Sequence, residues 1–187
     1  MKEHIWPSFR FTLLSVVFFI GVYPIIIWLA AWFAPGKGEG ETISMNGRVV
    51  GYKLLGQKFT EDRYFQGRPS VVDYNAAASG ASNKGPTNPD YLELIRQRID
   101  SFMAHNPGIQ KHDIPSDLVT SSGSGLDPDI SIEAALVQVN RIATVRNLSP
   151  ASLRDLVEAQ KDQPLFGFLG LTKVNVLRLN ISLDNMK

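Results

Sequence analysis

The chain has 187 residues, with 19 Lys and Arg against 18 Asp and Glu, and it contains no cysteine. The absence of cysteine excludes disulfides and thiolate metal sites. The charges are almost balanced, and no cluster of Lys and Arg of the kind that grips a phosphate backbone occurs in the sequence. The composition therefore predicts no nucleic-acid partner.

An apolar run from Phe11 to Phe33 contains no Asp, Glu, Lys or Arg. At about 1.5 Å of rise per residue, such a run crosses the roughly 30 Å hydrocarbon core of a bilayer as one helix. We therefore predict an N-terminal tail at 1–10, a transmembrane anchor helix at 11–34 and a linker rich in Pro and Gly at 35–41.

A cleaved signal peptide is the alternative interpretation of this run. Its apolar core is usually about 7–15 residues long and leads to a cleavage site made of small residues. Here the run is longer, and Trp28 and Trp32 stand where small residues would be needed. Tryptophan favours the membrane interface, so we predict a retained anchor. Pro24 removes a backbone hydrogen bond in mid-run, which predicts a kink.

The tail carries Lys2 and Arg10, which favour a cytoplasmic N-terminus. Lys37, Arg48 and Lys53 follow the span, so the count of basic residues does not itself favour that side. Long domains, however, cross the membrane largely regardless of charge. A basic tail ahead of the first apolar run resembles a signal anchor, so we expect a single-pass membrane protein whose domain lies outside the cytoplasm.

Residues 42–187 are predicted to form one extracytoplasmic domain of the α+β class. Asn46-Gly47 between two apolar segments predicts a β-hairpin, because both residues accept positive φ. Apolar positions at helical spacing predict three helices. The first begins at Asn88-Pro89, the second follows Ser131, and the third begins at Ser149-Pro150.

Near the C-terminus, apolar residues alternate with polar ones, which is typical of a half-buried strand. We expect this strand to pair with the early hairpin. The alternating apolar positions are Leu177, Leu179, Ile181 and Leu183.

Motifs of known enzymes are missing from the sequence. There is no Gly-Lys-Ser or Gly-Lys-Thr phosphate loop and no Asp-Lys-Thr-Gly phosphorylation motif. The scattered histidines His4, His105 and His112 predict no metal site. A membrane-anchored serine hydrolase would need His105 or His112 as its base, but no Gly-x-Ser-x-Gly elbow is present. We therefore assign no catalytic residue and keep this hydrolase as the enzymatic alternative.

The densest unusual segment is rich in Ser and Gly. Small residues let backbone amides point at an anion and hydroxyls add donors, so a phosphate cradle is one interpretation. The other is a surface loop that positions the next helix, with Asp127 and Asp129 as turn formers. A calcium loop fits poorly, because Ser131 and Ile132 stand where a ligand and Gly are needed. The candidate binding residues are Ser122, Gly123, Ser124 and Gly125.

Gln138 and Arg141 are three residues apart on the second predicted helix, so they lie on one part of its surface. They could hydrogen-bond a nucleotide or a partner protein. Residues of these types more often form a solvated helix face, which is the alternative interpretation.

Several segments, taken in order, cover nearly the whole chain and resemble the C subunit of the Kdp-type potassium-transporting ATPase. Besides the single N-terminal span, they are Gly56-Gln57-x-Phe59, Tyr64-Phe65-x-Gly67-Arg68-Pro69-Ser70, Ser82-Asn83-x-Gly85-Pro86-Thr87-Asn88-Pro89, Asp117-Leu118-Val119-Thr120-Ser121-Ser122-Gly123-Ser124-Gly125-Leu126-Asp127-Pro128, Gln138-Val139-x-Arg141 and Val174-Asn175-Val176-x-x-Leu179-Asn180.

The resemblance implies a complex of the bacterial inner membrane that uses ATP to import potassium with high affinity, and the domain outside the cytoplasm would then be periplasmic. Its partners would be a P-type ATPase subunit, a channel-like potassium-translocating subunit and a small accessory subunit. The C subunit is expected to be a non-catalytic subunit that assists assembly and acts as a catalytic chaperone, raising the ATP affinity of the ATPase subunit. ATP, bound indirectly or transiently, is the implied cofactor, and Gln138 and the loop from Ser122 to Gly125 are the implied nucleotide-binding residues.

These expectations conflict at one point. A periplasmic domain would place Gln138 where no ATP is available, whereas the hydrolysing subunit keeps its nucleotide domain in the cytoplasm. Either the domain faces the cytoplasm, or its effect is conveyed through the membrane. The alternative function is a membrane-anchored periplasmic module that caps or gates a pore partner without touching nucleotide.

Overall fold

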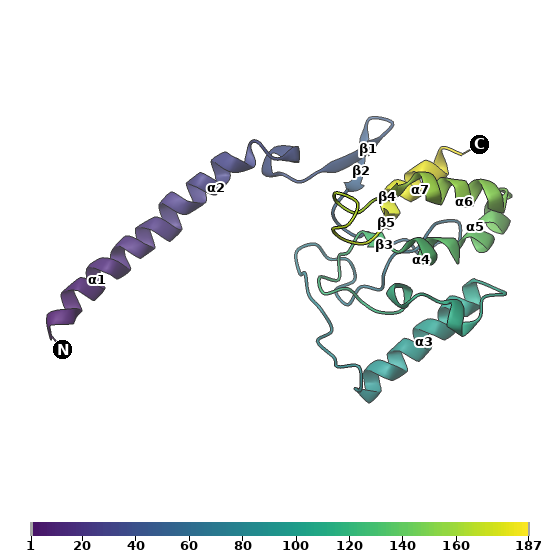
Figure 1. Ribbon diagram of the computed structural model, residues 1–187, viewed down its shortest axis with the longest axis horizontal. Helices are drawn as coiled ribbons and strands as arrows, with labels where there is room; N and C mark the ends of the chain where they lie inside the picture. The colour runs from purple at the N-terminus through teal and green to yellow at the C-terminus, as the bar shows by residue number, and fades with distance from the viewer. Residues whose placement is uncertain (1, 187) are drawn as a thin grey trace. The chain divides into compact units, whose positions relative to one another are not determined.

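The structure is a computed structural model that describes residues 2–186 of the chain. The chain divides into unit 1, Met1–Thr42, and unit 2, Ile43–Lys187. Figure 1 shows the elements of both units.

Unit 1 contains one continuous helical rod made of α1 (Lys2–Val17), a π-helical turn (Phe18–Val22) and α2 (Tyr23–Ala31). Its segment Glu3–Ala31 has 29 residues and a mean hydropathy of 2.5, which is long and apolar enough to cross a membrane. The π turn lies directly before Pro24, and a π turn relieves the clash of a proline ring with the preceding helical turn. A 3₁₀ turn follows at Pro35–Gly38.

The predicted hairpin is confirmed. Strands β1 (Thr42–Met45) and β2 (Arg48–Tyr52) form a two-stranded sheet of their own. Asn46 and Gly47 have φ values of 51° and 75°, the positive pair that a tight hairpin turn requires.

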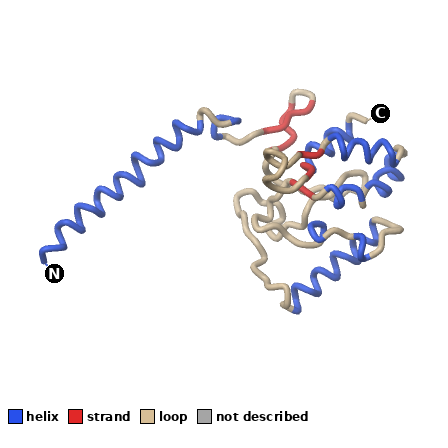
Figure 2. The backbone as a smooth tube through the Cα atoms, in the orientation of Figure 1, coloured by secondary structure: helices blue, strands red, loops and turns tan. Residues whose placement is uncertain are grey.

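All three predicted helices begin where their capping residues indicate. Helix α3 (Pro89–His105) is capped by the side chain of Asn88, which accepts a hydrogen bond from the Tyr91 amide at 3.0 Å. Helix α6 (Pro150–Ala159) is capped in the same way by Ser149. A long irregular segment leads from β2 to α3 (Figure 2).

The prediction of one helix after Ser131 is only partly right, because the segment forms two helices, α4 (Ile132–Leu136) and α5 (Val139–Arg146). The Ser131 side chain caps α4. The backbone amide of Gln138 then donates to the carbonyl of Ala135 at 3.1 Å. This bond joins residues three positions apart, as in a 3₁₀ turn, rather than four apart as in an α-helix. This turn separates the two helices.

The predicted C-terminal strand is wrong: residues Val176–Asp184 form helix α7. Asn175 caps this helix, since its side chain accepts from the Arg178 amide at 3.1 Å. Both periods fit the apolar positions, but the buried residues follow the helical one, with a polar residue on the inner face. The buried positions are Val176, Leu177, Leu179, Asn180 and Leu183.

The hairpin does not pair with the C-terminal region. Instead β3 (Asp129–Ile130), β5 (Lys173–Asn175) and β4 (Lys161–Asp162) form a small antiparallel sheet in the order β3-β5-β4. Val174 lies opposite both Ile130 and Lys161. These short strands are local additions to a domain that consists mainly of helices and loops.

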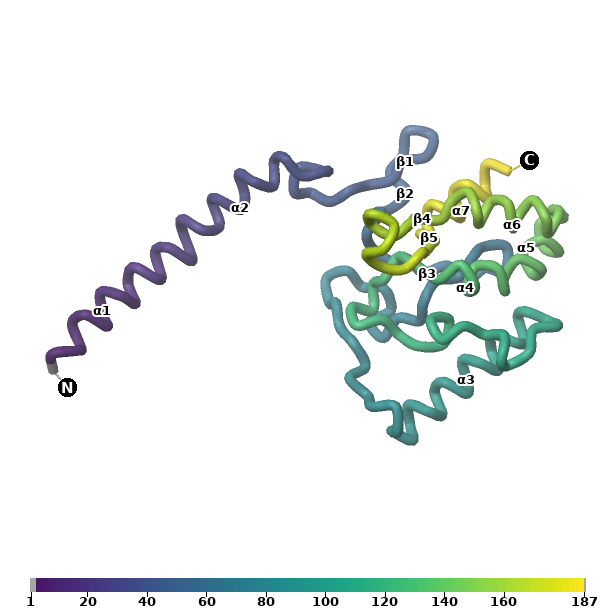
Figure 3. The backbone as a smooth tube through the Cα atoms, viewed as in Figure 1, coloured from purple at the N-terminus to yellow at the C-terminus, as the bar shows by residue number. Residues whose placement is uncertain are grey.

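The core of unit 2 is formed where α4, α5, α6 and α7 pack together and against β5. Figure 3 shows this group, with α3 drawn below α4. Phe65 enters the core from the irregular segment and is 0% exposed. The combination of helices with small antiparallel sheets confirms the α+β class. Other fully buried core residues are Ile142, Leu153, Leu179 and Leu183.

Candidate functional site

Gln138 lies at the junction of α4 and α5, with a side chain that is completely buried. Its Oε1 accepts from the backbone amide of Gln66 and from Nη2 of Arg141, both at 2.8 Å. Its Nε2 donates to the carbonyls of Gln66 at 3.1 Å and Ala134 at 2.9 Å. An amide side chain has two donors and two acceptor lone pairs, so these four bonds use all of them.

Arg141 is buried beside Gln138, with a side chain that is 2% exposed. Nε donates to Oδ1 of Asn106 at 2.9 Å, and Nη1 and Nη2 share the carbonyl of Tyr64 at 3.2 Å. Nη1 also donates to the carbonyl of Asp62, and Nη2 to Gln138. All five guanidinium donors are therefore used within the protein.

Burial lowers the pKa of Arg141, and the nearby Asp62 carboxylate, 3.8 Å from Nη1, opposes that shift. A guanidinium removed from water is costly unless it is bonded in full. The five bonds therefore compensate the group where it lies, and they tie α5 to Asp62, Tyr64 and Asn106.

Asn180 on α7 makes a similar contact with the residue before Gln66. Its Oδ1 accepts from the Phe65 amide at 2.8 Å, and its Nδ2 donates to the Phe65 carbonyl at 2.9 Å. The side-chain amides of Gln138 and Asn180 thus satisfy the backbone of two consecutive residues, as neighbouring strands would in a sheet. This arrangement fixes the Phe65 ring in the core.

The interpretation of Gln138 and Arg141 as a solvated helix face is therefore wrong. Sequence reasoning also missed Asn180, which it placed on the polar side of a strand. The signal that could have found it was the helical spacing of Val176, Asn180 and Leu183, together with the capping residue Asn175.

The candidate loop from Ser122 to Gly125 is a compact turn that is bonded to itself. Oγ of Ser122 accepts from the Gly125 amide at 2.9 Å, and Oγ of Ser124 accepts from the Leu126 amide at 3.1 Å. These two amides are occupied and are not offered to an anion. Ser122 and Gly125 are buried, whereas Gly123 and Ser124 are exposed.

The same loop holds the irregular segment against the rest of unit 2. The Ser124 carbonyl accepts from the Gly80 amide at 2.9 Å and from the Ser79 hydroxyl at 3.1 Å. Gly125 has a φ of 67°, and a Cβ there would lie 2.8 Å from a Val72 methyl group, so only glycine fits. In the described part of the chain, no hydrogen bond joins this loop to Gln138.

A cavity of about 690 Å³ lies elsewhere on unit 2, and neither Gln138 nor the Ser122–Gly125 loop lines it. Its wall carries more acidic than basic side chains. Four of its carboxylates are already bonded: Asp113 to the Gln110 backbone amide, Asp117 to Ser131, Asp127 to Arg68, and Asp129 to Lys173. Within residues 2–186, no group of three or more His, Asp or Glu is arranged to hold a metal ion.

The two histidines of unit 2 each lie beside an aspartate. Nδ1 of His105 lies 2.9 Å from Oδ1 of Asp62, and Nε2 of His112 lies 3.4 Å from Asp113, both on the exposed surface. Over the described range, no hydrogen bond joins a serine hydroxyl to either ring.

Comparison with known proteins gives one result along the whole chain. The family model described as "K+-transporting ATPase, c chain" matches residues 5–185. The chain belongs to the KdpC family. Among curated KdpC relatives, the potassium-transporting ATPase KdpC subunit of Flavobacterium psychrophilum is 52% identical over 99% of this chain and 100% of the relative.

More distant members agree. The KdpC subunit of Bacteroides fragilis is 46% identical over 96% of this chain and 96% of the relative. The KdpC subunit of Caldanaerobacter subterraneus is 43% identical over 98% of this chain and 95% of the relative. The family resemblance found in the sequence is confirmed. This KdpC chain is a subunit of a potassium-transporting ATPase, and its apolar helix indicates association with a membrane.

Proposed function

We propose that this chain is a non-catalytic subunit that assists assembly of the potassium pump and raises the ATP affinity of its P-type ATPase subunit through protein contacts alone. The observation that carries this proposal is the burial of Gln138, whose four hydrogen-bonding positions are all occupied inside the domain. A side chain in this state would have to break bonds to Gln66 and Arg141 before it could touch a nucleotide.

The expected partners are the P-type ATPase subunit, the channel-like subunit and the small accessory subunit. We place the domain of this chain in the periplasm, in line with the basic tail before the apolar helix. ATP binding would then occur on the ATPase subunit in the cytoplasm, and the effect of this chain would cross the membrane through the assembled complex.

The second candidate function is a periplasmic module that caps or gates the channel-like subunit with no influence on ATP. The turn from Ser122 to Gly125 is equally consistent with both candidate functions. Its backbone amides at Gly125 and Leu126 are bonded within the turn, and neither function requires them to bind nucleotide. The two candidates differ in whether the complex without this chain binds ATP more weakly.

The proposal is tested by photolabelling the purified complex with azido-ATP and by measuring the KM for ATP with and without this chain. We expect label on the ATPase subunit only, and a higher KM when this chain is omitted. Label on unit 2 would overturn the proposal of protein contacts alone. An unchanged KM would favour the capping function.

Topology is tested separately with single cysteines, since the chain has none of its own. His4→Cys precedes the apolar run, and Ser101→Cys lies on the exposed side of α3. A membrane-impermeant maleimide on intact cells should label Ser101→Cys, and should label His4→Cys only after lysis. The reverse pattern would place the domain in the cytoplasm.

A further inference from the structure

An uncharged loop between β4 and β5 exposes a cluster of large apolar side chains. Single exposed apolar residues are ordinary on protein surfaces, but a contiguous group of five marks a binding surface. The sequence from Gln163 to Thr172 contains no charged residue. The exposed side chains are Leu165 (64%), Phe166 (78%), Phe168 (75%), Leu169 (52%) and Leu171 (85%).

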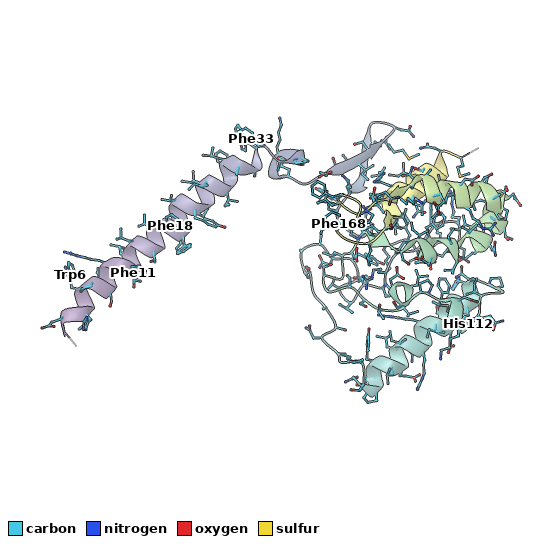
Figure 4. All side chains as sticks on the ribbon, in the orientation of Figure 1. Trp6, Phe11, Phe18, Phe33, His112 and Phe168 are labelled. Carbon is cyan, nitrogen blue, oxygen red and sulfur yellow. The ribbon has the colours of Figure 1, made fainter. Side chains whose placement is uncertain are left out.

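The backbone of this loop is folded so that it satisfies part of its own hydrogen bonding. The amides and carbonyls of Leu165 and Leu169 exchange two bonds, of 3.0 and 2.9 Å, and the Gly167 amide bonds to the Pro164 carbonyl at 2.9 Å. Phe166 and Gly167 adopt positive φ to close this turn. Phe168, labelled in Figure 4, lies on it at the edge of unit 2. Self-bonded backbone lowers the cost of leaving water.

The loop has a second apolar group beside it. Asn175, at the end of β5, donates to the Lys53 carbonyl at 2.8 Å, which joins the strand after the loop to the chain just after β2. The hairpin and its exit expose Val49 (61%) and Leu54 (63%). Leu54 is therefore next to a residue that is bonded to the strand following the loop.

Electrostatic attraction between the base of the loop and anionic lipid headgroups contributes little. Lys173 is paired with Asp129, and Arg178 with Asp162 at 3.0 Å. The flanking cations are thus neutralised by acids of the same domain. The surface suits an apolar environment rather than an anionic one.

The short segment between the candidate span and β1 indicates that the surface which the loop contacts is the bilayer. The candidate span ends at Ala31 and β1 begins at Thr42, so ten residues separate them. Such a segment extends at most about 35 Å, which keeps the start of unit 2 close to the membrane surface on either side of the bilayer. Tethering raises the local concentration of a weakly binding surface, so even modest apolar burial leads to occupancy.

We propose that the loop from Gln163 to Thr172 is a second membrane contact of this chain, which inserts its Phe and Leu side chains into the interfacial region of the bilayer beside the anchor. The contact orients unit 2 relative to the membrane. Because the flanking cations are paired, binding should not require anionic lipid.

The test uses the full-length chain reconstituted in phosphatidylcholine nanodiscs. Phe168→Cys is labelled with an environment-sensitive fluorophore, and Leu171→Cys repeats the measurement at a second exposed position. Ser101→Cys on α3, labelled with the same fluorophore, controls for the affinity of the probe itself. Circular dichroism confirms that each variant is folded.

We expect blue-shifted emission from the labels at 168 and 171, and loss of that emission when the discs contain nitroxide-labelled lipid. The label at 101 should stay solvent-like. Solvent-like emission at all three positions would overturn the proposal. Emission that shifts only after the other pump subunits are added, without lipid quenching, would also overturn it and would assign the loop to a protein partner.

Discussion

Replacement of Gln138 by Leu tests whether this residue holds the domain together. Leucine fills a similar volume but leaves the backbone amide and the backbone carbonyl of Gln66 without their partners. Arg141 also loses one of its five hydrogen bonds. Each buried group left unpaired costs about 1–3 kcal/mol, and Gln66 is only partly buried, so we expect a loss of about 2–4 kcal/mol in the free energy of unfolding.

For a domain of this size, 1 kcal/mol shifts Tm by about 2–4 °C, so Gln138→Leu should melt about 5–15 °C lower. The assay is a circular-dichroism melt of the full-length chain in mild detergent. Hydrogen exchange of a peptide containing Phe65 and Gln66 provides a local readout, since the Gln66 amide loses its acceptor and should exchange faster.

Asn140→Leu is the matched control, because Asn140 is exposed on the same helix and receives the same new side chain. Its unfolding free energy should change by about 0.5 kcal/mol or less. A melt of Gln138→Leu that coincides with the wild type, combined with a raised KM for ATP in the complex, would refute the structural reasoning and indicate direct contact with nucleotide.

Three further outcomes are expected from melts of the same kind. Gly56→Ala should destabilise the domain clearly, because the new Cβ would lie 2.6 Å from the Asp127 carbonyl oxygen; an unchanged Tm would show that this backbone can move apart. Phe65→Ala should cost about 3–5 kcal/mol, since the ring is completely buried, and a cost below about 1 kcal/mol would contradict its place in the core. The hydrogen bond to Asp129 raises the pKa of Lys173 above its ordinary 10.5, so this pair stabilises the fold below that pH and its contribution is lost as pH rises through the folded pKa. Wild type should therefore lose more stability than Lys173→Met in melts between pH 9 and 12, and parallel losses would show that the pair contributes nothing.

Local chemistry explains which elements were predicted well. The Asn46-Gly47 turn, the cap at Asn88 and the cap at Ser149 each depend on residues within four positions of one another, so the sequence alone specifies them. The apolar helix is specified in the same way, by its length and composition.

The errors occur where two periods or two environments fit the same residues. Leu177, Leu179 and Leu183 suit a strand or a helix, and only the packing of α7 against the core decides between them. Similarly, the sequence shows Gln138 and Arg141 on one helix surface but not what covers that surface.

The sequence by itself therefore determined the family, the long apolar helix, the hairpin and the starts of the helices. The tertiary structure alone decided the state of the candidate site. Gln138 is buried because the backbone of Gln66, 72 residues earlier in the chain, lies against it and takes up its amide. A bond between residues so far apart depends on how the whole chain folds, and no local pattern of residues contains that information.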